Sequence, residues 1–156
     1  MAIREIRINK EPVLLQACKP IDEVTPHVQL LLEDMLDTLR ATPGCTAISA
    51  NQVGLLRRLV VVDLGSGPQK LVNPVITAQS GEQESFEECI SFPYIHGIMS
   101  RPQKVTVTAL DENGTPLELT AEDASATRLC HAIDHLNGKV FVDHVIRFVN
   151  MDEDNE

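Results

Sequence analysis

Two histidines, His131 and His135, most constrain the fold of this chain, because they lie in a segment with the apolar spacing of a helix. Residues four apart share one helix face, so the two imidazoles can leave that face about 6 Å apart and bind one metal ion. Histidines at this spacing also occur on solvated and core-packed helices, so the pair alone is not specific. Apolar residues of the segment direct the histidine face toward a core: Leu129, Ala132, Ile133 and Leu136. A metal site therefore needs a third ligand from elsewhere in the chain.

Cys89 is the best candidate for that third ligand. It lies in the segment 87–93, which has the character of a strand end or a turn. Two histidines and one cysteine leave a fourth position open, which is typical of catalytic rather than structural metal sites. The other cysteines are either small buried hydrophobic residues or groups with a chemical role: Cys18, Cys45 and Cys130. Because consecutive helix residues point about 100° apart, Cys130 should miss the metal and belong to the core.

A first helix is expected near the start of the chain. Thr25 is a good N-cap and Pro26 suits the first helical position. The dipeptide Pro43-Gly44 ends the pattern. One apolar stripe runs along this helix: Val28, Leu31, Leu32, Met35, Leu36 and Leu39. The helix is therefore interpreted as an element that covers the core.

The histidine pair belongs to a second predicted helix. It should begin near Thr120, with Asp123 three residues later in a capping-box arrangement. It should run to Asn137, because Gly138 then occupies the usual C-terminal position. This boundary assignment places both histidines in the last two turns of the helix.

Strands are expected between the two helices, at 58–64, 70–77, 104–109 and 117–120. Pro74 should mark an edge or a bulge, and residues 111–114 (DENG) form a hairpin turn. Residues 1–24 are expected to be extended or irregular, and 141–149 to be a strand or the last turn of a helix. A helix, a set of strands and a second helix predict an α+β fold with a mostly antiparallel sheet.

The length and charge limit the domain organisation and the partners. The 156 residues fit a single domain over 1–150, followed by an acidic tail over 151–156 that holds four carboxylates. With 13 basic and 23 acidic residues, the net charge of -10 argues against nucleic acid and anionic membranes as partners. No apolar run reaches the roughly 18 residues of a membrane span, and the first 20 residues lack the apolar centre of a signal peptide. We therefore expect a cytoplasmic location and reduced thiols.

Three short motifs, in order along the chain, resemble those of the peptide deformylase family, metalloenzymes that remove the formyl group from the N-terminal methionine of new bacterial polypeptides. The family motif G-x-G-x-A-A-x-Q corresponds to residues 45–52 (CTAISANQ). The motif E-G-C-L-S corresponds to 87–91 (EECIS), and Q-H-E-x-D-H corresponds to 130–135 (CHAIDH). The resemblance extends from the amino-terminal segment to Asp143. It implies the deformylase fold, with mostly antiparallel sheets around a central metal-binding helix.

The resemblance also implies a role for individual residues. Cys89, His131 and His135 would hold one divalent metal ion, Fe²⁺ in many family members, with Zn²⁺, Ni²⁺ or Co²⁺ able to replace it. A bound water would then act as the nucleophile on the formyl carbon. Gln52, through its side-chain amide, and Ile90, through its backbone N–H, would stabilise the oxygen that gains charge.

Further residues are assigned to the surroundings of the metal and to the substrate cleft. Asp134 and Arg101 would orient the metal ligands, where the alternative is an ordinary surface ion pair. Ala47, Glu88 and His96 would line the path of the substrate, and Glu88 should narrow it. Cys45 is also expected near this cleft.

Several positions depart from the family pattern. Ala132 stands where the family has the glutamate that acts as general base and acid, a group that typically contributes about 10² to 10⁴ in rate. Glu88 replaces a glycine, and His96 falls where many members carry an arginine that contacts the peptide. Other replacements affect the first and third motifs: Cys45 and Ala47 for glycines, Ser49 for alanine and Cys130 for glutamine.

Three functional hypotheses follow. The first is metal-dependent hydrolysis of the N-formyl group from formyl-methionyl peptides or another N-formyl substrate, impaired because Ala132 cannot move a proton. The second is a non-catalytic protein that binds peptide N-termini or a small formylated ligand. The third is a hydrolase of altered specificity in which Glu88 or His96 replaces the missing base. Metal content, formate release and the effect of a glutamate at position 132 separate them.

Overall fold

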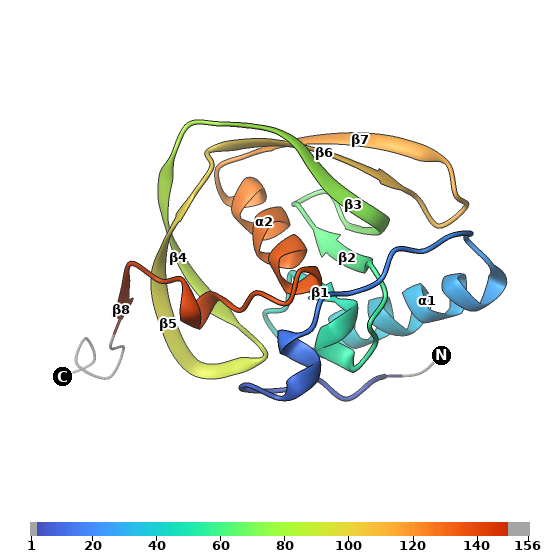
Figure 1. Cartoon of the computed structure of the whole chain (residues 1–156), viewed down its shortest axis with the longest axis horizontal. Helices are drawn as coiled ribbons and strands as arrows, with labels where there is room; N and C mark the ends of the chain where they lie inside the picture. Colours follow the sequence, from blue (N-terminus) through green and yellow to red (C-terminus); the bar gives the residue numbers. More distant parts are fainter. Residues whose placement is uncertain (1–2, 150–156) are drawn as a thin grey trace.

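The chain forms two antiparallel sheets that lie around a central helix, which confirms the predicted α+β fold (Figure 1). The computed structural model describes residues 3–149. Within them the helices are α1 (Pro26–Ala41) and α2 (Ala124–Leu136), with three 3₁₀ turns, η1 (Pro12–Leu15), η2 (Ala50–Val53) and η3 (Phe141–Asp143). The strands are β1 (Ala47–Ser49), β2 (Leu59–Asp63), β3 (Pro68–Ser80), β4 (Gln83–Cys89), β5 (Phe92–Arg101), β6 (Lys104–Leu110), β7 (Pro116–Glu122) and β8 (Arg147–Val149).

The larger sheet has the strand order β1-β2-β3-β6-β7, and the smaller one has the order β4-β5-β8. β3 belongs to the first sheet and β4, which follows it directly, to the second, so the chain passes between the sheets at Gly81. The predicted irregularity at Pro74 is confirmed, because the pairing of β3 with β6 shifts register between Val72 and Val75. A proline cannot donate a ladder hydrogen bond, which favours a bulge at this point.

Strand β2 is covered on both faces, which explains its unbroken apolar sequence. Val60 and Val62 pack in the cluster that contains α2, whereas Leu59 and Val61 pack in the cluster that contains α1. Strands that are buried on both faces are continuous hydrophobic runs rather than alternating ones. The large sheet is thus held between the helix expected to cover the core and the helix expected to carry the metal ligands.

The predicted limits of α1 agree with the structure. Thr25 accepts a hydrogen bond from the N–H of Val28 at 3.2 Å, as expected of an N-cap, and Pro26 is the first helical residue. The helix ends at Ala41, just before Pro43. Its buried residues include every member of the predicted apolar stripe.

The predicted start of the second helix is wrong. β7 continues to Glu122 and pairs with β6 throughout, so Thr120 is a strand residue opposite Thr106. α2 begins at Ala124, and the Asp123 side chain makes no capping hydrogen bond. Instead Asp123 has φ +55°, a conformation that turns the chain sharply from strand to helix. The other end agrees with the prediction: Asn137 caps the helix and Gly138 follows it in the left-handed region.

The hairpin of β4 and β5 was not predicted, because β4 buries a charged side chain and exposes an apolar one. Along β4 the buried side chain is a charged one, Glu87, whereas Phe86 is about half exposed. The usual rule that apolar residues of a strand face the core would therefore turn the wrong face of β4 inward. The segment 141–149, predicted as a strand or a helical turn, contains both, as η3 and the short strand β8.

Residues 151–156, where we predict an acidic tail, lie outside the described residues. Between residues 3 and 149, no helix has the length and apolar character needed to cross a membrane.

Gly138 offers a test of how tightly the metal-bearing helix packs on the amino-terminal segment. It has φ +75°, and a Cβ atom there would lie 2.8 Å from the carbonyl oxygen of Leu15. We expect Gly138→Ala to lower the free energy of unfolding by about 3 kcal/mol, through backbone strain and this clash. Gly44→Ala is the matched control, because Gly44 has φ +74° and no atom within 4 Å of the added Cβ. It should cost only about 1 kcal/mol. Urea unfolding measures both, and equal losses would contradict the close packing.

Candidate metal centre

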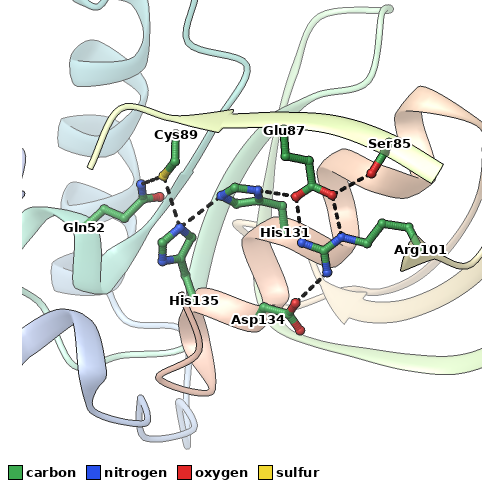
Figure 2. A network of polar contacts seen from close by, with 8 residues as sticks. All are labelled: Gln52, Ser85, Glu87, Cys89, Arg101, His131, Asp134 and His135. Atoms are coloured by element: carbon green, nitrogen blue, oxygen red, sulfur yellow. Dashed lines mark hydrogen bonds and ion pairs between the residues drawn. The ribbon is translucent and has the colours of Figure 1, made fainter. Parts of the chain in front are cut away.

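Three side chains meet beside α2 in the arrangement that the sequence predicts. Cys89, at the end of β4, and His131 and His135 on α2 place one ligand atom each within 4.8 Å of one another. The Cys89 Sγ lies 3.3 Å from His135 Nε2, and the two histidine Nε2 atoms are 3.2 Å apart. Figure 2 shows the three groups facing a common point between the strand and the helix. A thiolate and two imidazole nitrogens fit one divalent transition-metal ion with a fourth position open.

The histidine-bearing part of α2 is fixed by the segment that resembles the first motif. The Ser49 hydroxyl donates to the Ala132 carbonyl at 2.6 Å, and the Asn51 amide donates to the His135 carbonyl. Each of these carbonyls thus gains a side-chain donor from the segment 49–51, which ties the end of α2 to that segment. Both contacts are buried. They set the height of the two imidazoles along the helix axis relative to Cys89.

A buried carboxylate orients one of the two imidazoles. Glu87 Oε1 lies 2.8 Å from His131 Nδ1, and it accepts the Nδ1–H because a carboxylate is acceptor-only. In the neutral imidazole this leaves the lone pair of His131 on Nε2, the atom that belongs to the ligand cluster. This carboxylate–histidine pairing is the usual support of a metal-binding imidazole. The hydrogen bond from Ser85 to the other oxygen, 2.6 Å long, helps to hold Glu87 in place.

Arg101 compensates the buried charge of Glu87. Its Nε and Nη2 atoms donate to the two carboxylate oxygens at 2.7 Å each, and its Nη1 donates to Asp134 at 2.6 Å (Figure 2). The Arg101 side chain is only 6% exposed, so the alternative of an ordinary surface ion pair is wrong for it. Arg101, Glu87, Asp134, Ser85 and His131 form one network, called here the carboxylate network.

The pKa values of the site show that its anionic groups favour positive charge at the histidines. Burial opposes ionisation of Cys89, but hydrogen bonds from His131 and His135 and their positive charge lower its pKa to about 5. Burial likewise opposes ionisation of Glu87, and the Arg101 guanidinium and His131 nevertheless lower its pKa to about 2. Burial disfavours the charged form of His131, whereas Cys89 and Glu87 raise its pKa to about 9. Negative groups therefore surround the histidines, which favours a cation between them.

The site opens into a cleft of about 710 Å³, and the cleft gathers all the remaining predicted residues. Its lining includes Ala47, Gln52, Glu88, Ile90, His96 and Ala132. Cys45 lines the cleft as well, as expected. The cleft walls come from the segment before β1, from the β4–β5 hairpin and from the first turns of α2.

Gln52 is held so that its amide nitrogen faces the ligand cluster. Its Oε1 accepts the N–H of Ser49 at 2.9 Å, which fixes the amide orientation. Its Nε2 then donates to the Ser91 hydroxyl at 3.0 Å and lies 3.4 Å from Cys89 Sγ. The side chain is almost fully buried. An amide donor is thus available beside the thiolate, although its role in a reaction stays a prediction.

Position 132 has no group that could transfer a proton. Ala132 is buried, and its methyl group packs in the core cluster of α2 at the edge of the cleft. Glu88 and His96 lie on the cleft wall and pair with each other at 3.2 Å. Among the described residues, the ligand cluster within 4.8 Å contains neither of them.

Cys18, Cys45 and Cys130 lie outside the ligand cluster within 4.8 Å. Cys18 and Cys130 are buried in the core, and burial raises the pKa of each thiol to about 11. Burial also raises the pKa of Cys45 to about 11, so it stays a neutral thiol in the cleft. His27 and His144 are exposed on the surface.

Some residues of the site were missed from the sequence. Ser91 and Asn51 position Gln52 and His135, and Ser85 contacts Glu87. Serine and asparagine are common everywhere, so their type carries no signal. Phe86 also lies at the cleft and stacks on His96, and only the strand register reveals this contact.

A Cys-His-His cluster at an open cleft, in an antiparallel α+β fold, defines a mononuclear metal site of the catalytic kind. The sequence profile of the polypeptide deformylase family matches residues 3–150. The chain belongs to this family.

Individual relatives agree with this assignment. The chain is 48% identical to a peptide deformylase of Caldanaerobacter subterraneus subsp. tengcongensis, over 98% of this chain and 96% of the relative. It is 45% identical to peptide deformylase 2 of Clostridium acetobutylicum, over 96% and 99% of the two chains.

Solved structures show the same fold. A peptide deformylase from Legionella pneumophila superposes with a TM-score of 0.88 at 39% identity, covering 92% of this chain and 86% of that one. A peptide deformylase from Synechococcus elongatus, in complex with actinonin, has a TM-score of 0.88 at 32% identity, covering 96% and 82%.

The carboxylate network can be tested by removing its cation. Arg101→Met leaves the buried Glu87 without its main partner, so we expect a loss of about 3–5 kcal/mol in the free energy of unfolding. Arg147→Met is the matched control, because Arg147 pairs with Glu84 at 3.3 Å where both side chains are more than half exposed. It should cost about 0.5 kcal/mol or less. Urea unfolding of the metal-free chains measures both, and a similar loss in the two would contradict the network's importance.

The same pair of variants should differ in pH dependence. The folded-state pKa of Glu87, about 2, lies below its ordinary value of 4.5. The stability that Glu87 contributes is therefore present above pH 4.5 and is lost as the pH falls toward 2. Arg101→Met should show a weaker loss over this interval than Arg147→Met.

Metal stoichiometry tests the ligand set. We expect one Co²⁺ per chain with the intense near-ultraviolet absorption of a thiolate ligand, and Cys89→Ser should lose this absorption and most of the affinity. Cys45→Ser is the control, because Cys45 lines the same cleft but lies outside the cluster within 4.8 Å. It should keep both. Loss of the absorption in Cys45→Ser rather than Cys89→Ser would overturn the assignment.

Proposed function

We propose that this chain is a metal-dependent hydrolase that removes the N-formyl group from formyl-methionyl peptides, with turnover slowed by Ala132. The observation that carries the proposal is the Cys89, His131 and His135 cluster with its buried Glu87 support, at an open cleft. The relatives named peptide deformylase, similar over nearly the whole chain, support the same reaction class.

One thiolate and two imidazoles favour a transition-metal ion of intermediate hardness as a Lewis acid. We propose Fe²⁺ in the cell, with Zn²⁺, Ni²⁺ or Co²⁺ able to replace it. When bound, such an ion supplies a Lewis acid and lowers the pKa of a coordinated water. The protein contributes the orientation of the ligands: Glu87 holds the His131 ring, and Asn51 fixes the helix end that carries His135.

Gln52 and Ile90 are proposed to stabilise the formyl oxygen as it gains negative charge. The Gln52 amide is fixed by Ser49 and presents its Nε2 beside Cys89, and Ile90 lines the cleft one residue after Cys89. Fixed donors in a site of low polarity are effective because they need no reorganisation during the reaction. Gln52→Leu should therefore reduce turnover more than it reduces metal binding.

The peptide is proposed to lie along the wall that contains Ala47, Glu88 and His96. These residues line the cleft that also contains Cys89 and His131. The Glu88 side chain extends this wall, where a glycine would leave the strand backbone bare. Its bulk supports the expectation that the path of the peptide is narrowed at this point.

We expect Ala132 to impair proton transfer without impairing the binding of substrate. An alanine methyl group cannot accept a proton from water or deliver one to the leaving amine, so we propose that formylated peptides bind normally and are hydrolysed slowly. Binding of a formylated ligand without any turnover is the second candidate, and the side chain at position 132 is the observation that favours it. The two candidates differ in whether the native chain releases formate.

Restoring a carboxylate at position 132 is the decisive experiment. We expect Ala132→Glu to raise kcat/KM for a formyl-methionyl peptide by about 10² to 10⁴, because a positioned general base contributes this much. Ala132→Gln is the matched control, since glutamine has the same size but cannot act as a base, and its rate should stay near that of the native chain. Formate release is measured on samples of equal metal content.

Each result has a definite meaning. Fast formate release by the native chain, unchanged by Ala132→Glu, would contradict the role assigned to position 132. Slow native release with rescue by glutamate alone supports the proposed function. No release by any of the three chains, with metal bound, would favour the ligand-binding candidate.

A further inference from the structure

Three side chains of the β4–β5 hairpin form a cluster on the cleft wall, called here the rim cluster. Glu88 and His96 are opposite each other in the antiparallel register, and Glu88 Oε2 lies 3.2 Å from His96 Nε2. The Phe86 ring stacks on the His96 ring with centroids 5.6 Å apart and an angle of 15° between the planes. All three residues line the cleft. None of them belongs to the ligand cluster within 4.8 Å or to the carboxylate network.

Glu88 is the carboxylate of this wall that remains open to a ligand. Its side chain is 69% exposed, and His96 is its only ion-pair partner in the part of the chain that the structure describes. The neighbouring carboxylates are already engaged. Glu87 is buried against Arg101 and His131, and Glu84 pairs with Arg147 at 3.3 Å.

His96 and Phe86 hold this carboxylate in place and add an aromatic surface beside it. A free surface glutamate samples many rotamers, whereas the contact with His96 restricts Glu88 to one side of the wall. Phe86 is 48% exposed although one of its faces covers His96. An exposed ring next to a carboxylate matches a Lys or Arg side chain, whose apolar stem packs on the ring while its charge meets the carboxylate.

The charge of the cleft agrees with such a ligand. Arg128, which lines the cleft from α2, is the only Lys or Arg among its described lining residues. Its Nη1 donates to the carbonyl of Asp63 at 3.2 Å. The cleft also contains three glutamates, of which Glu88 is the one without an arginine partner, in a chain of net charge -10. An acidic surface attracts cationic ligands from a distance.

We propose that the rim cluster selects formylated peptides that carry a Lys or Arg side chain shortly after the formylated residue. Glu88 binds the cation, and Phe86 contacts the stem of the same side chain. This selectivity rests on the proposed function, because it specifies which peptides enter the cleft of that hydrolase.

Affinity for a set of peptides tests the proposal. The full chain loaded with Zn²⁺ is titrated by calorimetry with amidated formyl-methionyl tetrapeptides in which Lys, Gln or Glu occupies the second, third or fourth residue in turn. At one of these positions, Lys should bind about five-fold tighter than Gln, and Glu should bind weaker than both. The preference should fall when the salt concentration is raised to about 0.5 M, since exposed ion pairs are screened.

Two variants assign the preference to the rim cluster. In Glu88→Gln the ratio of Lys to Gln affinities should fall to about one, whatever the affinity of each peptide. Glu84→Gln removes one negative charge from the same wall, but from a carboxylate that Arg147 already neutralises, so the ratio should persist. If the ratio falls equally in both variants, the preference for Lys peptides comes from the overall negative charge of the wall, and the proposal is overturned.

The peptide series also separates this inference from the proposed function. Equal binding of the Lys, Gln and Glu peptides at every position overturns the rim cluster as a selective site and leaves the hydrolase intact. Failure of every formylated peptide to bind the metal-loaded chain overturns both.

Discussion

The buried carboxylate of Glu87 is the interaction on which the site depends. It lies on β4 of the small sheet, its arginine partner lies at the end of β5, and its histidine partner lies on α2, which packs on the large sheet. A buried charge is tolerated only when nearly all of its hydrogen-bonding capacity is used, which fixes these three elements relative to one another. Such networks add little net stability compared with an apolar core of the same volume. Their effect here is to set the distance between Cys89 and the two histidines.

Much of the fold and the metal site could be predicted from the sequence because their signals are local. Helical spacing identifies α1, the continuous apolar run identifies β2, and the spacing of His131 and His135 fixes two ligands on one helix face. Cys89 required more than spacing, since it lies more than 40 residues away from the histidines; its place in a segment typical of a strand end or turn made it the candidate. The start of α2 was missed because Thr120 has two local options, and the ladder with β6 favours the strand.

Features that depend on strand register could not be predicted. β4 buries Glu87 and exposes Phe86, so its pattern indicates the wrong inner face until the partner arginine is known. The contact between Glu88 and His96 likewise requires the hairpin register that places them opposite each other. From the sequence they are two separate departures from a family pattern. In the structure they are one pair on the cleft wall.

The structure also explains why the chain can keep a complete metal site without a carboxylate at position 132. The carboxylate network and the three ligands are held by Glu87, Arg101 and the contacts of Ser49 and Asn51, none of which requires a side chain larger than alanine on that turn of α2. The methyl group of Ala132 fills its place in the core cluster, and its carbonyl is the part of the residue that anchors the helix. We therefore expect metal binding and proton transfer to be separable in this chain. None of the contacts that hold the ligands involves the side chain at position 132.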